Sequence, residues 1–426
     1  MRRKIYCVLL SALLLSSCGL TGSVEQLLVP PTVSEEQSEV YDALADDTGS
    51  GITLVYPRTG EHRGAFIFAD TDGDGTDEAF AFYRNSSSPN VRVNLLKKND
   101  RGWHSVYDHS GPGTGVEEVF FTDYGGDNTY MCIGFSSPAQ HDKVFTVYSV
   151  ENDMMTALFS EVYNMLINVD INLDGGEDTV LINSATEDHS AYALLIADKK
   201  DGSGVRSVSG TVMRSNGVEQ INAVAGGISG GAAAIFVDSN VSGGISTEVL
   251  YCVEGSLRNP AVLDDSSIPT LTLRRSGLSQ DIDGDGVVEI PTLTPFPGYR
   301  DSDGQNMTIW NEFENYTLSK KYTSLYMPSQ GYCFMLPVRW QGLVTVKTDA
   351  SSGEKVFCKF NSSLSESRME LMRIISVDAA SENEYLEKGY TVAAETDTRS
   401  IMVLCTSAED PLVLTQSEIE NGMIML

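Results

Sequence analysis

Residues 65–83 read Ala65-Phe66-Ile67-Phe68-Ala69, then Asp70-Thr71-Asp72-Gly73-Asp74-Gly75-Thr76-Asp77-Glu78, then Ala79-Phe80-Ala81-Phe82-Tyr83. Two apolar, aromatic runs flank an acidic segment that contains two glycines. Short apolar runs bounded by turn-forming residues are typical of buried strands. The stretch therefore predicts a strand, an acidic loop and a second strand.

This arrangement recurs along the chain. Loops that begin near residues 70, 123, 170, 225 and 281 each adjoin apolar runs, and we number them first to fifth. Each unit has room for four short strands. Because a lone four-stranded sheet cannot bury both faces, sheets arranged around an axis can cover one another, as in a β-propeller. We predict a mainly β fold, with a propeller of about five blades over residues 51–329.

The blade count depends on the first strand of this region. Residues 52–56 either complete the ring by pairing with the last blade or begin a sixth blade. A β-sandwich or an open strand array is the alternative architecture.

The repeat stops after Gly331, and residues 330–426 predict a small α+β domain. Its apolar runs are interrupted by two segments with helical character, residues 381–387 and 415–420. A degenerate sixth blade with an extension is the alternative.

The pattern D-x-[DN]-x-D-G-x-x-[DE] occurs in the first, third and fifth loops. Calcium takes six to eight oxygen ligands, and a tight loop directs oxygens at positions 1, 3 and 5 toward one centre. Glycine at position 6 permits the bend, a backbone carbonyl at position 7 adds an oxygen, and the carboxylate at position 9 completes the site. The predicted Ca²⁺ ligands are Asp70, Asp72, Asp74, Thr76 and Glu78; Asp170, Asn172, Asp174, Gly176 and Asp178; and Asp281, Asp283, Asp285, Val287 and Glu289.

Carboxylates packed this closely repel one another unless a cation lies between them. A set of solvated acidic turns is the alternative, since Asp and Gly are common in turns. The second and fourth loops lack most of the ligand residues, and we predict that both are metal-free.

The repeats resemble the FG-GAP and VCBS family of calcium-binding propeller repeats, which also occur in integrin α-type propellers. The resemblance is strongest in residues 68–78 and covers residues 52 to about 320. It implies that ions stiffen turns within the blades while the rims bind partners. An EF-hand would need Glu at loop position 12, where Ala81 and Leu181 stand, and helices on both sides.

The N-terminus carries targeting features. Residues 2–4 are basic, an apolar run follows, and Leu15-Ser16-Ser17-Cys18 resembles the lipobox of bacterial lipoproteins. The resemblance implies that residues 1–17 are a signal peptide and that Cys18 carries the lipid. Residues 18–50 then form a tether with a short helix, which a capping box between Ser34 and Gln37 begins.

Composition narrows the function. With 59 acidic and 29 basic residues, the net charge of −30 disfavours binding to nucleic acid. Five cysteines remain beyond Cys18, and the odd number without a CxxC pair supports neither a disulfide framework nor a zinc site.

We therefore expect a lipid-anchored bacterial cell-surface protein that faces outward and is not an enzyme, with no catalytic residues assigned. Its calcium-stabilised propeller would bind or scaffold an extracellular protein or glycan. The alternatives are a polysaccharide-active hydrolase or lyase and a structural or assembly lipoprotein of the cell envelope.

Overall fold

The computed structural model describes residues 34–49, 51–126, 128–136, 143–186, 189–199, 204–214, 220–406 and 409–426. The predicted signal peptide and the predicted lipid site Cys18 lie outside these residues. Within them, no helix is long and apolar enough to cross a membrane.

The described chain is mainly β and forms successive antiparallel sheets. The first sheet holds β1 (Ile52–Leu54), β2 (Phe66–Ala69), β3 (Glu78–Asn85), β4 (Arg92–Asn99) and β5 (Gly102–Ser110). The second holds β6 (Gly115–Thr122), β7 (Tyr130–Ser136), β8 (Lys143–Glu151) and β9 (Met154–Tyr163). The third holds β10 (Met165–Val169), β11 (Asp178–Asn183), β12 (Tyr192–Lys199) and β13 (Gly204–Val212).

The later sheets follow in the same way. The fourth holds β14 (Gln220–Gly227), β15 (Ala233–Val241), β16 (Gly244–Val253) and β17 (Ser256–Arg258). The fifth holds β18 (Glu289–Pro295), β19 (Asn306–Glu314), β20 (Thr317–Met327), β21 (Tyr332–Met335) and the C-terminal β27 (Met423–Met425). The last sheet holds β22 (Val344–Thr348), β23 (Lys355–Lys359), β24 (Glu370–Asp378), β25 (Thr391–Glu395) and β26 (Arg399–Cys405), accompanied by α5 (Glu382–Glu387) and α6 (Gln416–Gly422). A short helix α4 (Ile268–Leu271) precedes the fifth sheet.

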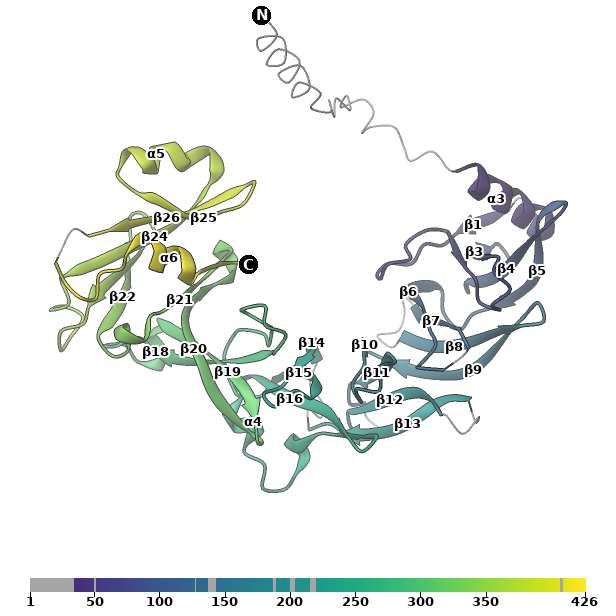
Figure 1. The fold of residues 1–426 in the computed structure, drawn as a ribbon, viewed down its shortest axis with the longest axis horizontal. Coiled ribbons are helices and arrows are strands. Elements are labelled where there is room, and N and C mark those ends of the chain that lie inside the picture. The colour runs from purple at the N-terminus through teal and green to yellow at the C-terminus, as the bar shows by residue number, and fades with distance from the viewer. Residues whose placement is uncertain are drawn as a thin grey trace, which may run out of the picture.

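The sheets follow one another along an open arc, with the first sheet at one end and the C-terminal sheet at the other (Figure 1). In the described part of the chain the sheets do not close into the ring that a propeller requires. The predicted strand at residues 52–56 neither joins the last sheet nor begins a further one, because β1 pairs with the far half of β3 while β2 pairs with the near half.

Alternating side chains hold the arc together, because β7, β11 and β15, the second strands of the second, third and fourth sheets, are largely buried on both faces. In β7, Met131 and Ile133 pack in a core shared with the first sheet, whereas Tyr130 and Cys132 pack in a core shared with the third. The fourth sheet behaves in the same way: Ile235 faces the third sheet, and Phe236 packs with Ile290 and Phe313 of the fifth. Each sheet is thus the cover of its neighbour.

The two ends of the arc have covers of a different kind. At the first sheet, α3 (Glu35–Thr48) places Val40 and Leu44 against Ala79, Ala81 and Tyr83 of β3. The predicted capping box is present, since Gln37 N donates to Ser34 Oγ and Ser34 N donates to Gln37 Oε1. At the other end, Phe334 of the fifth sheet packs against Trp340 and Phe357 in the core of the C-terminal sheet.

The cysteines of the described region are free thiols: Cys132, Cys252, Cys333, Cys358 and Cys405. Burial raises the pKa of the Cys132 thiol to about 12, which keeps it protonated and unreactive. These residues act as small apolar side chains in the cores.

The cover at the first sheet gives a stability prediction. Because Leu44 is fully buried, Leu44→Ala should lower the free energy of unfolding by about 2–5 kcal/mol. Tyr41→Ala is the matched control, since Tyr41 on the same helix is 39% exposed and its loss should cost far less. Urea unfolding of both variants measures the difference, and equal midpoints would contradict the role of α3 as a cover.

Candidate metal-binding loops

The first loop joins β2 to β3 and gathers three of its predicted ligands. Asp70, Asp72 and Glu78 each offer a carboxylate oxygen, and the three oxygens lie within 4.8 Å of one another. Glu78 is 2% exposed, and its Oε2 accepts hydrogen bonds from Thr71 N (2.9 Å) and Thr71 Oγ1 (2.7 Å). The closing carboxylate is therefore held in place by the loop itself.

The three loops share a backbone framework. The Oδ2 atom of the position-1 aspartate accepts the N–H of the position-6 glycine, at 2.9, 2.9 and 2.8 Å in the first, third and fifth loops. The Oδ1 atom of the position-5 aspartate accepts the N–H of position 7, which is Thr76, Gly176 or Val287, at 2.8, 3.1 and 2.9 Å. The position-6 glycines have φ values of 86°, 93° and 87°, which explains why only glycine stands there.

The third loop, between β10 and β11, differs in its carboxylates. Asp170, Asp174 and Asp178 do not form a three-carboxylate group of the kind seen in the first loop, whereas Asn172 Nδ2 donates to Asp178 Oδ2 at 2.9 Å. Burial, followed by the charges of Asp174 and Asp170, raises the pKa of Asp178 to about 6. The loop also holds Leu173 at φ 59°, where the other two loops have glycine.

The fifth loop lies directly before β18. The strand–loop–strand pattern predicts a strand before it, but in the described residues no strand lies between β17 and the loop, and Gln280 forms only an isolated bridge with Glu289. Asp281, Asp283 and Asp285 form one three-carboxylate group, and Asp285, Glu289 and Glu312 form another. Glu312 belongs to β19 and was not among the predicted ligands.

A lysine ammonium group lies among the carboxylates of the first loop. Lys97 Nζ in β4 lies 2.5 Å from Asp72 Oδ2 and 3.8 Å from Glu78 Oε1. It also lies 3.0 Å from Asp153 Oδ1 in the β8–β9 turn of the second sheet. Lys97 therefore connects the loop to the neighbouring sheet.

The fifth loop contains a second lysine in an equivalent role. Lys321 Nζ in β20 lies 3.0 Å from Asp283, 2.5 Å from Asp285, 2.8 Å from Glu289 and 3.3 Å from Glu312. All four of these carboxylates belong to the fifth loop and the fifth sheet.

These contacts change the pKa values of the loop carboxylates and of the lysine ammonium groups. The hydrogen bond from Lys97 lowers the pKa of Asp72, and the hydrogen bond from Lys321 lowers the pKa of Asp285. Desolvation acts to lower the pKa of Lys321, but its hydrogen bonds to Asp285, Glu289 and Asp283 prevail and raise it. Both lysines therefore remain charged at neutral pH.

Strand register explains which loops receive a lysine. Ala79 pairs with Leu96, so that Lys97, the next residue of β4, lies beside Glu78. In the third sheet Thr179 pairs with Ile196, and the residue beside Asp178 is the uncharged Ala197. In the fifth sheet Glu289 pairs with Glu312, so that the lysine comes from the next strand, β20.

The second and fourth loops are simple turns. In the second, Asp123 Oδ1 accepts the N–H of Gly125 at 2.8 Å, while Asp127 lies outside the described residues. In the fourth, Gly231 N donates to Ile228 O at 3.0 Å, and the turn contains no carboxylate.

A buried ion pair anchors the approach to the fifth loop. Asp238 in β15 and Arg274 have fully buried side chains, with Asp238 Oδ1 2.7 Å from the guanidinium. Asp238 also accepts hydrogen bonds from Thr247 Oγ1, Ser279 Oγ and Ser279 N, at 2.6, 2.8 and 2.6 Å. Because Ser279 stands two residues before Asp281, this network joins the fourth sheet to the base of the fifth loop.

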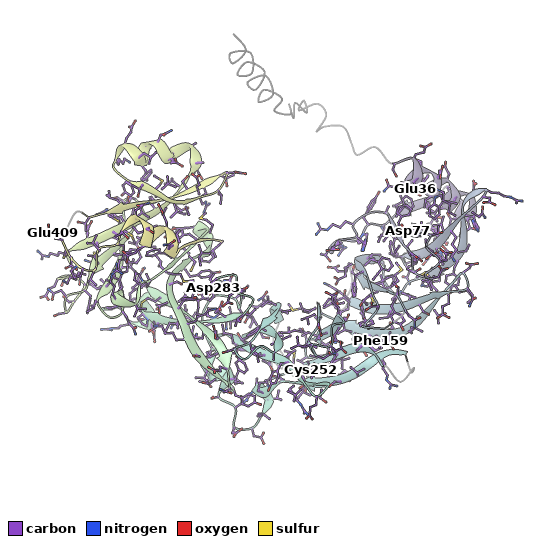
Figure 2. All side chains as sticks on the ribbon, in the orientation of Figure 1. Glu36, Asp77, Phe159, Cys252, Asp283 and Glu409 are labelled. Carbon is purple, nitrogen blue, oxygen red and sulfur yellow. The ribbon has the colours of Figure 1, made fainter. Side chains whose placement is uncertain are left out.

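The first and fifth loops are separated in space. Asp77 of the first loop and Asp283 of the fifth lie on opposite arms of the arc (Figure 2). Each loop is therefore an independent local site, and the loops do not converge on one centre.

Comparisons with known proteins do not assign this chain to a family. No family model matches the chain, and no curated protein matches it. Among solved structures, exotype rhamnogalacturonan lyase YesX matches with 11% identity and a TM-score of 0.26, over 73% of this chain and 62% of the lyase. Saccharomyces cerevisiae Sqt1 matches with 11% identity and a TM-score of 0.31, over 79% of this chain and 86% of Sqt1. A Lactobacillus plantarum protein matches with 9% identity and a TM-score of 0.28, over 73% of this chain and 84% of its own.

The Asp238–Arg274 pair gives the second prediction. Asp238→Asn should lower the free energy of unfolding by about 3–5 kcal/mol, because it leaves the buried Arg274 guanidinium without a counter-charge. The double variant Asp238→Leu with Arg274→Met should lower the free energy of unfolding by a smaller amount, since it buries no charge. Guanidinium unfolding of both variants measures this, and a double variant less stable than the single one would contradict the account.

Proposed function

We propose that this chain is a lipid-anchored bacterial cell-surface protein whose array of β-sheets binds or scaffolds an extracellular protein or glycan, without catalysis. Calcium in the acidic loops would stabilise the array. The observation that carries the calcium part is the gathering of three carboxylate oxygens within 4.8 Å in the first loop and again in the fifth.

The residues of the first loop fit a hard cation. Asp70, Asp72 and Glu78 supply oxygen ligands, which are the kind that calcium prefers. Lys97 does not prevent binding, because Asp153 offers its ammonium group a second partner outside the loop. A bound Ca²⁺ would supply charge neutralisation and would cross-link the ends of the loop.

The fifth loop is less well suited to a calcium ion than the first loop is. Asp283, Asp285 and Glu289 supply oxygens, but Lys321 contacts all three and, among the described residues, has no carboxylate partner outside the fifth loop and sheet. We therefore expect calcium to bind there more weakly than in the first loop. In the third loop Asp170 and Asp178 form no ion pair with any described lysine or arginine, so that within this part of the chain no ammonium group competes at these two carboxylates.

Support for a binding role comes from the architecture. The sheets are packed by apolar cores on both faces, which leaves the connecting loops on a rigid frame. Recognition residues in proteins are often carried on loops of this kind. Lipid attachment at Cys18 and the outward-facing location remain part of the proposal.

The calcium proposal gives the third prediction. Lys321→Met should lower the melting temperature in the presence of a chelator, because four carboxylates lose their counter-charge. The same variant should bind calcium in the fifth loop at least about tenfold more tightly, which corresponds to about 1.4 kcal/mol. Calorimetric titrations that reach the millimolar range, with thermal melts, measure both effects.

The control is Lys320→Met. It removes the same charge from the adjacent residue, and Lys320 forms no ion pair within the described part of the chain. In calorimetric titrations this variant should bind calcium as tightly as the parent protein does. If the parent and Lys321→Met show no calcium-dependent shift in melting, the fifth loop is not a calcium site.

The binding role gives the fourth prediction. The mature chain, immobilised through its N-terminus, should retain a partner from extracellular and envelope fractions, and millimolar calcium should increase retention over a chelator control. A parallel glycan array and protein crosslinking on whole cells separate the two partner classes. Depolymerisation of a polysaccharide by the purified chain would instead favour the enzymatic alternative.

A further inference from the structure

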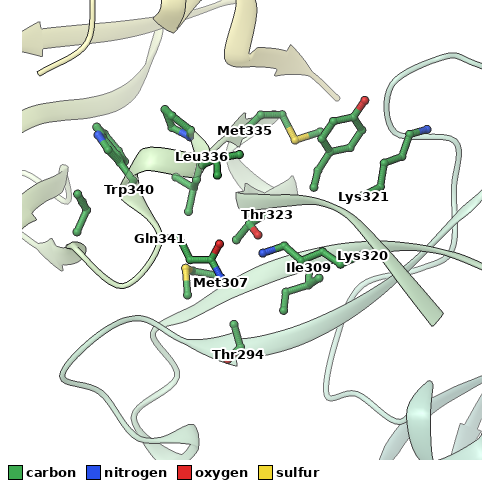
Figure 3. A pocket seen from close by; sticks show the side chains of 14 residues that line it. Thr294, Met307, Ile309, Lys320, Lys321, Thr323, Met335, Leu336, Trp340 and Gln341 are labelled. Carbon is green, nitrogen blue, oxygen red and sulfur yellow. The ribbon is translucent and has the colours of Figure 1, made fainter. Parts of the chain in front are cut away.

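A pocket of about 300 Å³ lies where the fifth sheet meets the first segment of the C-terminal sheet (Figure 3). One wall comes from β18, β19 and β20, and the other from residues 335–344. The walls are joined by a backbone hydrogen bond from Leu336 N to Thr323 O at 2.7 Å. A pocket of this size is within the range that small organic ligands occupy.

Most of the lining is apolar. Met307 and Ile309 of β19 face Leu336 and Trp340 across the space. Trp340 is fixed, because its Nε1 donates to Leu412 O at 2.7 Å and its ring packs against Phe357. The apolar wall is thus formed before any ligand binds.

Three polar side chains also line the pocket: Lys320 and Gln341, which are exposed, and Thr323, which is half-buried. Figure 3 shows the side chains of Lys320, Thr323 and Gln341 directed toward the same part of the pocket. Lys320 forms no ion pair within the described residues, although the protein carries 59 acidic residues. Thr323 Oγ1 is buried and finds no hydrogen-bond partner among the residues that the structure describes.

The lining also lacks acidic residues. Two lysines contribute to it and no Asp or Glu does. Lys321 already contacts carboxylates of the fifth loop, so that the positive charge offered to the pocket belongs to Lys320. An anionic group in the pocket would meet an ammonium group, a hydroxyl and an amide, each of which can donate a hydrogen bond.

We propose that this pocket binds a small carboxylic acid with an apolar body, either an aliphatic acid or an aryl acid. Its carboxylate accepts hydrogen bonds from Lys320, Thr323 and Gln341, and its body lies against Met307, Ile309, Leu336 and Trp340. The buried Thr323 hydroxyl gains the partner that it lacks, which removes the cost of an unpaired polar group. The lining contains no residue of the acidic loops, although Lys321 borders both the pocket and the fifth loop, and this inference does not depend on calcium.

The ligand class can be tested with three probes of equal chain length. Octanoate, octan-1-ol and octylamine are titrated into the full mature chain, with calorimetry and saturation-transfer NMR as readouts. Octanoate should bind saturably at one site, octan-1-ol at least tenfold more weakly, and octylamine more weakly still. Phenylbutyrate then distinguishes an aryl acid from an aliphatic acid as the better occupant.

Variants locate the site. Lys320→Met should weaken octanoate binding at least tenfold and leave octan-1-ol binding unchanged, because it removes the charge and keeps the length of the side chain. Thr323→Val should weaken octanoate binding several-fold. Lys388→Met is the charge-matched control, since Lys388 lies in the exposed α5 segment and pairs with Glu384 at 2.7 Å; this variant should bind octanoate like the parent.

Thermal melts confirm that each variant is folded. The proposal is overturned if octanoate shows no saturable binding up to millimolar concentration. It is equally overturned if octanoate and octan-1-ol bind alike, or if Lys320→Met and Lys388→Met bind octanoate alike. Ile309→Trp provides an independent check, because it fills the pocket without changing charge and should abolish binding of every probe.

Discussion

The structure depends on the need of each four- or five-stranded sheet to have both of its faces covered. Alternation along a strand sends successive side chains to opposite faces, so the central strands can only be buried between two neighbours. Met131 and Cys132 of β7, adjacent in sequence, belong to different cores for this reason. A row of such sheets has two uncovered ends, which a closed ring would eliminate. Here the row is open, and the ends are covered by α3 and by the C-terminal sheet.

A second constraint is charge. Neighbouring carboxylates repel one another and the net charge of −30 adds to that repulsion, so a nearby cation stabilises a carboxylate-rich loop. In the first and fifth loops the chain itself supplies positive charge, through the ammonium groups of Lys97 and Lys321. A divalent ion and an ammonium group therefore compete for the same oxygens, and the outcome in each loop depends on whether the lysine has another partner. Asp153 supplies one for Lys97.

Much of the strand order could be predicted from the sequence, because apolar runs and turn residues are local signals. The acidic loop between β2 and β3, the capping box at Ser34 and the helix near residue 416 are all of this kind. Ring closure could not be predicted in this way. Whether residues 52–54 pair with the last sheet or with β3 is decided by contacts between segments that are distant in sequence. The acidic-loop motif contains no information about those contacts.

The candidate metal-binding loops also depend on contacts that a local sequence pattern does not determine. One motif occurs three times with the same aspartate-to-backbone hydrogen bonds, yet the loops differ because of the residue across from position 9. The residue across from position 9 is Lys97 in the first sheet, Ala197 in the third and Glu312 in the fifth. Its identity depends on the pairing register of the next strand, which begins after a turn of variable length. A pattern that counts positions within one loop therefore predicts the oxygens but not the cation that competes for them.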